Sequence, residues 1–414
     1  MGLVVMKFGG SSVADADKIR AAAARAIRTK NEGNQVVMVV SAMGDSTDDL
    51  LDLAKQVAKN PPKREMDQLL ATGEQVTISL MAMALEDAGT PAISFTAGQI
   101  GMVTDDVHTK ARIKRIDSAK VHRELAAGRV VIVAGFQGVT EDGAVTTLGR
   151  GGSNVTLVAI AAALKADVCE NYTDVDGIYT ADPRIVPNAR KVDRVSYDEM
   201  LELASLGANV LHNRAVEFAK KYNVPIHVRG AGTDRKGTMI VAESDEMERI
   251  VVSGAALKKA LARITLRNVP DRVGLAASIF HALAAAKIVV DDIIQTETTP
   301  KVATVSFTVE LTDLPDVRKV CDELCRANAG MVAECTEDLA KVSVVGVGMR
   351  VHTGVAERMF AALAKAGINI HNITTSEIKI SCIIDKAQGP DALRAVHDAF
   401  DLGAKPKPPR AKKK

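Results

Sequence analysis

No stretch of the 414-residue chain comes near the run of about eighteen apolar residues that a membrane-spanning helix needs. The N-terminus also lacks a basic segment followed by a long apolar one, which a secretory signal would have. Both absences argue against a membrane protein and against an exported one. We therefore expect a cytoplasmic protein that does not bind membranes.

Cysteine is scarce, and its spacing shows no framework. None of the cysteines forms a Cys-x-x-Cys pair, and their number is odd; they are Cys169, Cys321, Cys325, Cys335 and Cys382. This pattern indicates free thiols in a reducing compartment rather than disulfides or a zinc site. Cys321 and Cys325 share one helical face, which we interpret as packing.

The chain carries little net charge. Its 53 basic and 51 acidic residues leave a formal charge of +2, and much of the excess lies in residues 404–414. We expect that segment to be disordered. No aromatic residue is interleaved with its charges, so we interpret it as a solvated tail and predict no nucleic-acid partner.

The first strand is not followed by a Walker A motif or by Gly-x-Gly-x-x-Gly, which argues against a nicotinamide dehydrogenase. A strand at residues 3–6 is instead followed by Lys7, the pair Gly9 and Gly10, and a helical pattern. Adjacent glycines let main-chain N–H groups approach an anion, and a helix N-terminus adds a positive end. A second glycine-rich segment, residues 146–154, follows a strand at residues 130–134 and also precedes a helix. Two such turns suggest a phosphoryl group that moves between two bound molecules.

The length predicts two or three domains. Up to residue 245, apolar strands at 36–40, at 130–134 and in the segment ending at Val168 alternate with amphipathic helices at 17–29 and 75–87. Continuous apolar strands are typical of a parallel sheet that helices cover on both faces. We therefore predict a three-layer αβα domain with a mostly parallel central sheet.

After a polar hinge at residues 243–246, the chain contains an internal repeat. Equivalent residues recur eighty positions apart, pairing Gly274 with Gly354, Phe280 with Phe360, Leu283 with Leu363, Ile288 with Ile368 and Ile293 with Ile373. Leu275, Ile279 and Leu283 are spaced to bury one helical face against a sheet. The repeat predicts two ferredoxin-like βαββαβ modules.

Several motifs, in register along nearly the whole chain, resemble those of the aspartate kinases. They are Lys-Phe-Gly-Gly-Ser-Ser at 7–12, Ser-Ala-Met-Gly-Asp at 41–45, Thr-Gly-Glu at 72–74, Gly-Arg-Gly-Gly-Ser at 149–153 and Tyr-Thr-Ala-Asp-Pro-Arg at 179–184. The resemblance implies an amino acid kinase domain at 1–245, and ACT domains at 262–335 and 336–403, with a strand at 250–260 as a candidate part of the second. It also implies ATP-dependent phosphorylation of L-aspartate, the first step toward lysine, threonine and methionine.

The resemblance assigns roles to particular residues. The transferring phosphoryl group and the nucleotide would be held by Lys7, Phe8, Gly9, Gly10, Ser11, Thr173, Asp174, Tyr179, Asp182, Arg184 and Asn209. Aspartate would be bound by Ser41, Thr47, Glu74, Arg150, Gly151 and Ser153. Mg²⁺ would be held mainly by the ATP phosphates, because the sequence offers no all-protein metal cage.

Two of these roles also follow from side-chain chemistry. The planar guanidinium of Arg150 can hold an α-carboxylate through two parallel hydrogen bonds. Glu74 is the candidate partner for the substrate ammonium. We expect it at the beginning of a helix, where a glutamate is commonly only a capping residue.

The sequence departs from the family pattern at two positions of the expected site. Asn154 stands where the family has an aspartate, and Asn209 stands where it has a lysine. The first change removes a negative charge from the catalytic centre, and the second removes a cation expected at the nucleotide phosphates. Hydrogen bonds to charged groups contribute roughly 1.5–3 kcal/mol each, so both changes bear on turnover.

In the repeat modules the resemblance implies an amino-acid effector, lysine or threonine or both. Asp271 and Gly274 precede a helix whose free N–H groups favour a ligand carboxylate, and Gln295 and Asn369 are further contacts, on matching strands of the two modules. The family's Asn-x-Asp-Met pattern is replaced here by residues 289–292. We expect a homo-oligomer, or an α2β2 assembly with a regulatory fragment that starts near Met247.

Two other functions remain open at this stage. A related kinase with another acceptor, such as acetylglutamate, glutamate or uridylate, would keep the fold, although the paired modules argue against it. A catalytically weakened sensor or regulatory subunit is suggested by Asn154 and Asn209. Turnover of ATP with aspartate distinguishes the latter from the kinase.

Overall fold

The computed structural model describes residues 2–207, 210–248 and 250–404. The chain forms two compact units, each described here by itself. The first contains Met1–Tyr179 and Lys191–Met247, and the second contains Thr180–Arg190 and Glu248–Lys414. The predicted tail from residue 405 onward lies outside the described residues.

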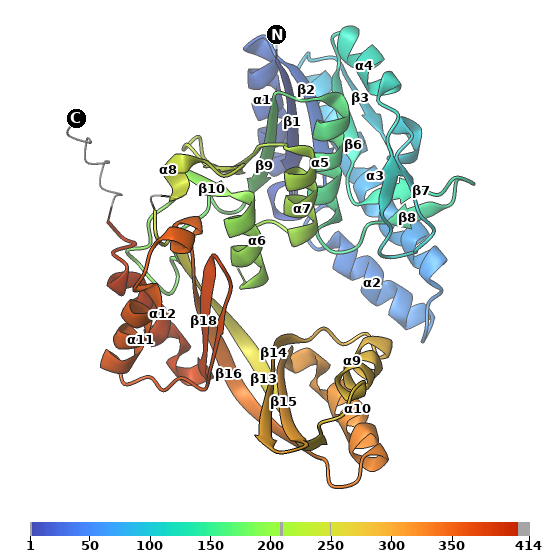
Figure 1. Cartoon of the computed structure of the whole chain (residues 1–414). Helices are drawn as coiled ribbons and strands as arrows, with labels where there is room; N and C mark the ends of the chain where they lie inside the picture. Colours follow the sequence, from blue (N-terminus) through green and yellow to red (C-terminus); the bar gives the residue numbers. More distant parts are fainter. Residues whose placement is uncertain (1, 208–209, 249, 405–414) are drawn as a thin grey trace, which may run out of the picture. The chain divides into compact units, whose positions relative to one another are not determined.

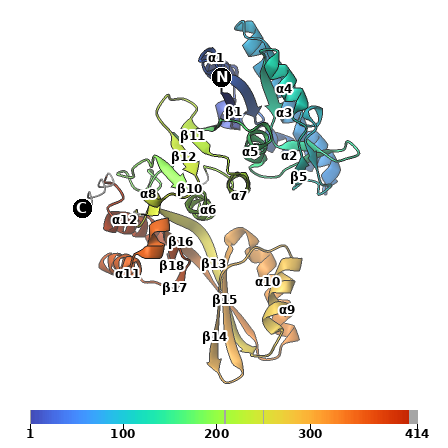
Figure 2. The same ribbon diagram turned by 45° about the horizontal axis from the view of Figure 1, so that its top comes forward.

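The first unit is built on an eight-stranded sheet in the order β10-β12-β11-β9-β1-β2-β6-β3 (Figure 1). The bounds of its strands are Leu3–Phe8 (β1), Gln35–Val40 (β2), Ala92–Phe95 (β3), Val130–Ala134 (β6), Val168–Thr173 (β9), Arg194–Ser196 (β10), Ile226–Gly230 (β11) and Thr238–Val241 (β12). Neighbouring strands pair in parallel except β11 and β12, which are antiparallel (Figure 2). The predicted mostly parallel sheet is confirmed.

Helices cover both faces of this sheet. Their bounds are Ala16–Asn31 (α1), Ser46–Val57 (α2), Lys63–Asp87 (α3), Ala119–Ala126 (α4), Gly152–Leu164 (α5), Tyr197–Ser205 (α6), Asn213–Tyr222 (α7) and Asp245–Glu248 (α8). Met6 and Phe8 point into a core with Ile19 of α1 and Met81 of α3. Because side chains alternate along a strand, Lys7 lies on the opposite face. The αβα layering predicted from the sequence is confirmed.

A small four-stranded sheet lies beside the main one in the first unit. It has the order β5-β4-β7-β8, and its strands are Val103–Thr104 (β4), Ile113–Arg115 (β5), Gln137–Val139 (β7) and Val145–Thr147 (β8). The hairpin β7–β8 stands between β6 and the second glycine-rich segment. The second glycine-rich segment follows the strand at 130–134 and precedes a helix, as predicted, with this hairpin leading into it.

Two element boundaries near the first glycine turn differ from prediction. Strand β1 continues to Phe8 rather than ending at residue 6, because β2 and β9 pair with it through that position. A 3-10 turn, Gly10–Ser12, follows it, and α1 begins at Ala16 with the Asp15 carboxylate as its N-cap. The glycine turn is thus not itself the N-terminus of a long helix.

Two further segments were assigned wrongly from the sequence. The strand expected to end at Val168 instead begins there, as β9, and the residues before it belong to α5, the helix predicted to follow the segment 146–154. Periodicity does not separate a fully buried helix from a buried strand. Helix α3 begins at Lys63 rather than at residue 75, so Glu74 lies in mid-helix and not in its first turn. Thr47 lies in the first turn of α2, not in a loop.

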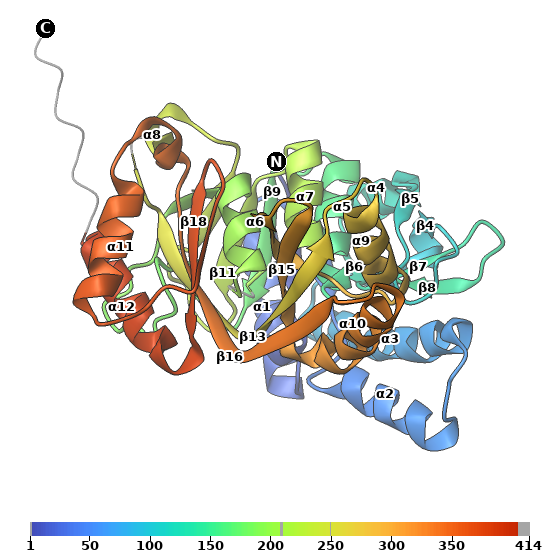
Figure 3. The same ribbon diagram turned by 60° about the horizontal axis from the view of Figure 1, so that its bottom comes forward.

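The second unit has a six-stranded sheet in the order β14-β15-β13-β16-β18-β17. Its strands are Gly254–Pro270 (β13), Asp291–Thr299 (β14), Val302–Glu310 (β15), Val332–Val345 (β16), Asn372–Thr375 (β17) and Lys379–Asp385 (β18). Its helices are Leu275–Ala285 (α9), Leu314–Ala327 (α10), Val355–Lys365 (α11) and Gly389–Ala399 (α12). Strands β13 and β16 run through both repeat modules, with α9 and α10 on one module and α11 and α12 on the other (Figure 3).

The predicted repeat is confirmed residue by residue. Helices α9 and α11 begin at Leu275 and Val355, eighty positions apart, and both have a left-handed glycine as N-cap. The first half of β13, Gly254–Lys258, pairs with Lys341–Val345 of β16. Its second half pairs with β16 as well, and also with β15 on its other edge. One long strand therefore contributes to both modules.

The segment Thr180–Arg190 belongs to the second unit although its neighbours in sequence belong to the first. Ala181 and Val186 are buried in the hydrophobic core of the second repeat module, with Leu393 of α12. The hydroxyl of Thr180 lies 3.0 Å from Nε2 of the buried His397. This segment is thus a structural part of that module.

No helix among the described residues is both long and apolar enough to cross a bilayer.

Candidate active site

Lys7 lies near the carboxyl end of β1, between β2 and β9. Its side chain is 8% exposed, and burial lowers its pKa from 10.5 to about 8, against the opposing charge of Asp174. Its Nζ lies 3.3 Å from the point where a Cβ on Gly9 would stand. The ammonium therefore lies against the glycine turn, where it can contact an anion bound by that turn, as the sequence predicted.

The glycine turn is shaped by its close contact with the loop after β2. A Cβ on Gly10 would stand 2.9 Å from the carbonyl oxygen of Ala42 and 3.0 Å from that of Gly44. The N–H of Gly44 donates to the carbonyl of Gly10 over 3.1 Å. Since any larger residue would clash with the backbone there, Gly10 is required for these two loops to meet.

Glu74 is buried in the middle of α3 and is 2% exposed. Its Oε1 accepts a hydrogen bond of 3.1 Å from the N–H of Ala42, whereas Oε2 has no hydrogen-bond partner within the described part of the chain. Burial raises the pKa of Glu74 to about 8. A buried carboxyl with an unpaired oxygen costs free energy unless a ligand or water completes it.

The second glycine-rich segment leads from β8 into α5. Gly149 and Gly151 both have left-handed backbone conformations, with φ of 78° and 70°. Arg150, between them, is exposed. Ser153 is buried in the first turn of α5, and the Oδ1 atom of Asn154 is buried without a hydrogen-bond partner among the described residues. This turn presents a guanidinium and polar side chains beside a helix N-terminus.

These groups line one cavity of about 460 Å³ at the carboxyl ends of the central strands. Predicted site residues in its wall are Lys7, Ser41, Thr47, Glu74, Arg150, Gly151, Ser153 and Asn154. Ligands of open α/β sheets bind at this edge. The structure thus brings together the aspartate-site residues that the sequence named, which come from four separate segments.

The predicted nucleotide residues are more dispersed. Thr173 ends β9, and its hydroxyl donates to Asp174, which is exposed and whose charge acts on Lys7. Tyr179 donates to Asp176 over 2.6 Å. The ring of Phe8 stacks on Tyr172 in the opposite core, so Phe8 can offer a ligand only its main chain.

Three predicted nucleotide contacts have a different status. Asp182 and Arg184 pair with each other, with distances of 3.0 Å from Nε and 2.8 Å from Nη2 of the arginine. Both belong to the second unit. Asn209 lies outside the described residues. Gly9, Gly10 and Ser11 flank Lys7 in the glycine turn but are not part of the cavity wall.

Sequence reasoning missed part of the site. Asp48, Thr109, Phe136 and Thr147 also line the cavity, and Asp67, fully buried on α3, is hydrogen-bonded to two of them. Asp67 lies seven residues before Glu74, so both acidic side chains share one face of the helix. That spacing of two carboxylates on a buried face was the signal that could have identified Asp67.

The residues predicted to bind an effector are all exposed. Asp271 and Gly274 lie in the loop before α9, and Gln295 lies on β14. Asn369 comes before β17, which begins at Asn372, so its predicted place on a strand matching that of Gln295 is wrong. Counting eighty positions back, its structural equivalent is Val289 in the turn before β14.

In the described ranges no group of three or more His, Cys, Asp or Glu side chains is arranged to hold a metal ion.

Residues 2–230 match the Amino acid kinase family, and residues 264–328 and 342–400 each match an ACT domain. Aspartokinase 2 of Bacillus subtilis (strain 168) is 50% identical over 406 residues, which are 98% of this chain and 99% of that protein. The chain belongs to the aspartate kinases of the amino acid kinase family. The predicted family and the two predicted ACT domains are confirmed.

Solved structures agree with this assignment. Aspartokinase III of E. coli in complex with aspartate and ADP has a TM-score of 0.81 at 25% identity, covering 96% of this chain and 99% of that one. The same enzyme in complex with lysine and aspartate has a TM-score of 0.78 at 26% identity, with the same coverage. The fold, the domain types and the order of the motifs are therefore those of the family.

Proposed function

We propose that this chain transfers the γ-phosphoryl group of ATP to the side-chain carboxylate of L-aspartate, giving 4-phospho-L-aspartate. The observation that carries the proposal is the single cavity lined by a buried ammonium, Lys7, a buried carboxyl, Glu74, and a guanidinium, Arg150. An amino acid with two carboxylates and one ammonium offers a charge complement to each of these groups. The names of relatives that are about half identical over the whole chain support the same acceptor.

The amino acid is bound by charge pairing at both ends. Glu74 accepts from the substrate ammonium through the oxygen that has no protein partner in the described residues, and Arg150 holds the α-carboxylate with two parallel hydrogen bonds. Ser41, Thr47, Gly151 and Ser153 complete the wall around it. This arrangement leaves the second carboxylate of aspartate free to react near Lys7.

Phosphoryl transfer to a carboxylate needs alignment and charge neutralisation more than covalent help, because the nucleophile is already anionic. Lys7 stabilises the negative charge on the transferring group, and Gly9, Gly10 and Ser11 supply main-chain donors beside it. The pKa of about 8 in the free protein rises when polyphosphate binds, so Lys7 is cationic when it is needed.

The nucleotide is held at and after the carboxyl end of β9, by Thr173, Asp174 and Tyr179. For Asp182, Arg184 and Asn209 a nucleotide role is proposed from the family motifs alone. Mg²⁺ is held mainly through the ATP phosphates and supplies charge neutralisation there.

Aspartokinase III of E. coli has been solved in complex with lysine. We propose that an amino acid also binds this chain and regulates its activity. Lysine, or threonine, binds at the loop of Asp271 before α9, where the left-handed Gly274 leaves helix N–H groups free for a carboxylate. An effector acts by binding two states unequally, so Asp271→Ala relieves inhibition without changing uninhibited turnover. Wild-type enzyme that ignores millimolar lysine, threonine and their mixture contradicts this role.

A separate regulatory fragment starting near Met247 is also part of the proposal, in an α2β2 assembly or beside a homo-oligomer. Met247 is the last residue of the first unit, which suits a start at that boundary. Such a fragment lacks Thr180–Arg190, whose Ala181 and Val186 are buried in the second repeat module. It would therefore need another chain to cover that core. Mass spectrometry of untagged protein from the native host decides whether the fragment is made.

The acceptor is tested with purified protein, MgATP and a panel of aspartate, glutamate, acetylglutamate and uridylate, with acyl phosphates trapped as hydroxamates. We expect product with aspartate alone. Arg150→Lys should raise the KM for aspartate strongly and leave the KM for ATP nearly unchanged, because a point charge cannot reproduce bidentate recognition. Turnover with another acceptor, or none, contradicts the assignment; weakened ATP binding would move Arg150 to the nucleotide.

A further inference from the structure

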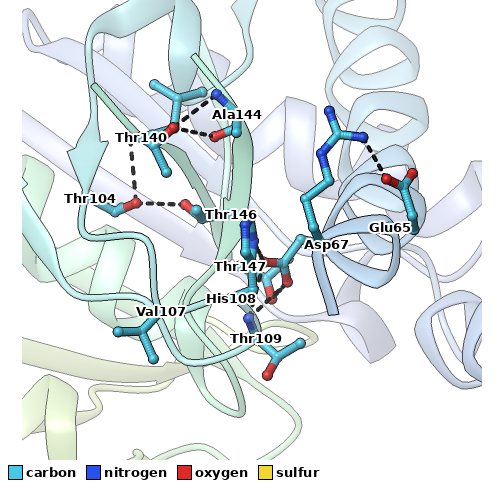
Figure 4. A network of polar contacts seen from close by, with 12 residues as sticks. Glu65, Asp67, Thr104, Val107, His108, Thr109, Thr140, Ala144, Thr146 and Thr147 are labelled. Atoms are coloured by element: carbon cyan, nitrogen blue, oxygen red, sulfur yellow. Dashed lines mark hydrogen bonds and ion pairs between the residues drawn. The ribbon is translucent and has the colours of Figure 1, made fainter. Parts of the chain in front are cut away.

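Asp67 is a carboxylate near the cavity with several hydrogen-bond partners. It is fully buried on α3, yet it does not line the cavity itself. Its Oδ1 accepts from the hydroxyl of Thr147 at 2.5 Å, and its Oδ2 lies 2.7 Å from Nδ1 of His108. Both oxygens lie within 3.1 Å of the main-chain N–H of Thr109. Figure 4 shows these groups converging on the one carboxylate.

Thr109 is held in an unfavourable backbone conformation. Its φ is 69°, in the left-handed region that β-branched residues rarely adopt. Such a conformation persists only where surrounding contacts impose it. One contact that holds Thr109 in place is the pair of hydrogen bonds from its N–H to Asp67. Thr109 in turn forms part of the cavity wall.

The position of Thr109 also affects the turn that carries Arg150. The carbonyl oxygen of Thr109 lies 3.0 Å from where a Cβ on Gly149 would stand, so the two backbones are in contact. From the far side, Arg214 of α7 donates to the carbonyls of Leu148, at 2.5 Å, and of Ala111, at 3.0 Å. These bonds secure the segments that flank the contact but do not reach the Thr109 N–H. Asp67 alone, among the described side chains, bonds that N–H.

We propose that Asp67 is a positioning residue for the amino-acid substrate: by holding the strained Thr109 against Gly149, it fixes the cavity wall and the Arg150 turn. It does so from α3, the helix that also carries Glu74 two turns later. One buried carboxylate therefore sets the spacing between the group that receives the substrate ammonium and the turn that receives its α-carboxylate. This inference rests on the proposed function, because it assigns a role within the same site.

The test is steady-state kinetics of the full-length enzyme, varying aspartate and ATP separately. In Asp67→Asn the amide keeps the size of the side chain but turns an NH₂ group toward donors. We expect the KM for aspartate to rise about tenfold or more, with the KM for ATP and the kcat at saturating aspartate within about threefold. Isothermal titration calorimetry with aspartate should show the same loss of affinity.

The matched control is Thr146→Val. Thr146 is buried on β8, next to Thr147, and shares a hydrogen bond of 2.7 Å with Thr104 (Figure 4). It does not line the cavity. Both variants should lose thermal stability, whereas only Asp67→Asn should change the KM for aspartate. A general weakening of the sheet would instead raise that KM equally in both.

A double-mutant cycle tests whether Asp67 acts through Thr109. Thr109→Gly relieves the backbone strain and keeps the N–H, so it is also the variant to use if Asp67→Asn does not fold. If Asp67 works by holding Thr109, the double variant should resemble the more severe single variant rather than the product of both. His108→Leu should show a smaller rise in KM, and His108→Asn, which retains a donor, should restore it.

The outcomes are distinguishable. Aspartate-dependent turnover by wild-type enzyme with an unaltered KM in Asp67→Asn and Thr109→Gly overturns the positioning role alone, as do effects that multiply in the double variant. A wild-type enzyme without aspartate-dependent turnover contradicts the proposed function. In that case the calorimetric affinities for aspartate across the same variants still decide the role of Asp67.

Discussion

The N–H of Ala42 donates to one carboxyl oxygen of Glu74 over 3.1 Å and leaves the other oxygen without a hydrogen-bond partner in the described structure. A Cβ at Gly73, the residue before, would stand 2.8 Å from the Cβ of Ala42, so a glycine in mid-helix lets the loop approach α3 this closely. Glycine there costs about 1 kcal/mol of helix stability relative to alanine. The close approach places in the cavity wall a buried carboxyl group with only one of its two oxygens hydrogen-bonded in the described residues.

This geometry predicts that aspartate binding releases a proton. The pKa of Glu74 is raised to about 8 by burial, so the group is protonated in the free protein at neutral pH. A bound ammonium favours the ionised form. Binding affinity should therefore increase with pH, by up to about tenfold per unit, and level off above about pH 8.

The measurement is calorimetry in two buffers of different ionisation enthalpy at pH 7. Glu74→Gln should bind aspartate more weakly and with no proton release. Binding by wild-type enzyme without release of a proton would show that Glu74 does not meet the ammonium.

Lys7→Ala should lower turnover by about a hundred- to a thousand-fold, since one preorganised electrostatic donor is lost at the transferring group. Calorimetric aspartate affinity should stay nearly unchanged, because Glu74 and Arg150 carry it. Lys59→Ala, which removes an exposed lysine on the segment after α2, is the control for a general effect of charge. Near-normal turnover in Lys7→Ala would contradict the role of this residue in stabilising the transferring phosphoryl group.

Asn154→Asp should increase kcat. The Oδ1 of Asn154 is buried in the first turn of α5 without a partner in the part of the chain described, and a carboxylate there would make hydrogen bonds about twice as strong with cationic donors. Asn154→Leu, similar in size but without polar atoms, should decrease kcat. No change or a decrease in Asn154→Asp means that the site is built around the amide.

Because His397 is buried, we expect the stability of the second unit to depend on pH. Its pKa is lowered from 6.5, chiefly by burial, with Arg190 lowering it and Asp398 raising it. The unfolded chain therefore binds a proton more readily than the folded one below pH 6.5, and stability falls as pH decreases through that window. The loss from one histidine is at most about 1.4 kcal/mol per pH unit.

Urea unfolding of wild-type protein and of His397→Gln at pH 7.5, 6.5 and 5.5 isolates this contribution. The difference in unfolding free energy between the two should shrink as the pH falls. Parallel pH profiles for both proteins would exclude the titration of His397 as a source of acid sensitivity. The readout reports on the packing of Thr180–Arg190 as well, because Thr180 contacts the same ring.

The layers, the repeat and most of the residues proposed to bind aspartate could be predicted from the sequence. Continuous apolar strands such as 130–134 indicate a sheet covered on both faces, and eighty-residue spacing fixed the start of α9 and α11. Lys7, Glu74 and Arg150 were named because their motifs resemble those of the aspartate kinases, and the chemistry of a guanidinium supported the role of Arg150. These features are local, or repeat at fixed spacing, so a linear pattern carries them.

Only the tertiary structure decided what depends on contacts between distant segments. The residues before Val168 were assigned to a strand although they end α5, because a helix buried on all sides has no polar face to mark its period. Asp67 meets Thr109 and Thr147 across 42 and 80 positions of sequence, and no local pattern encodes that meeting. Thr180–Arg190 joins the second unit because Ala181 and Val186 find apolar partners there. Burial supplies the free energy for such contacts, and which residues share a burial site is settled only when the whole chain is packed.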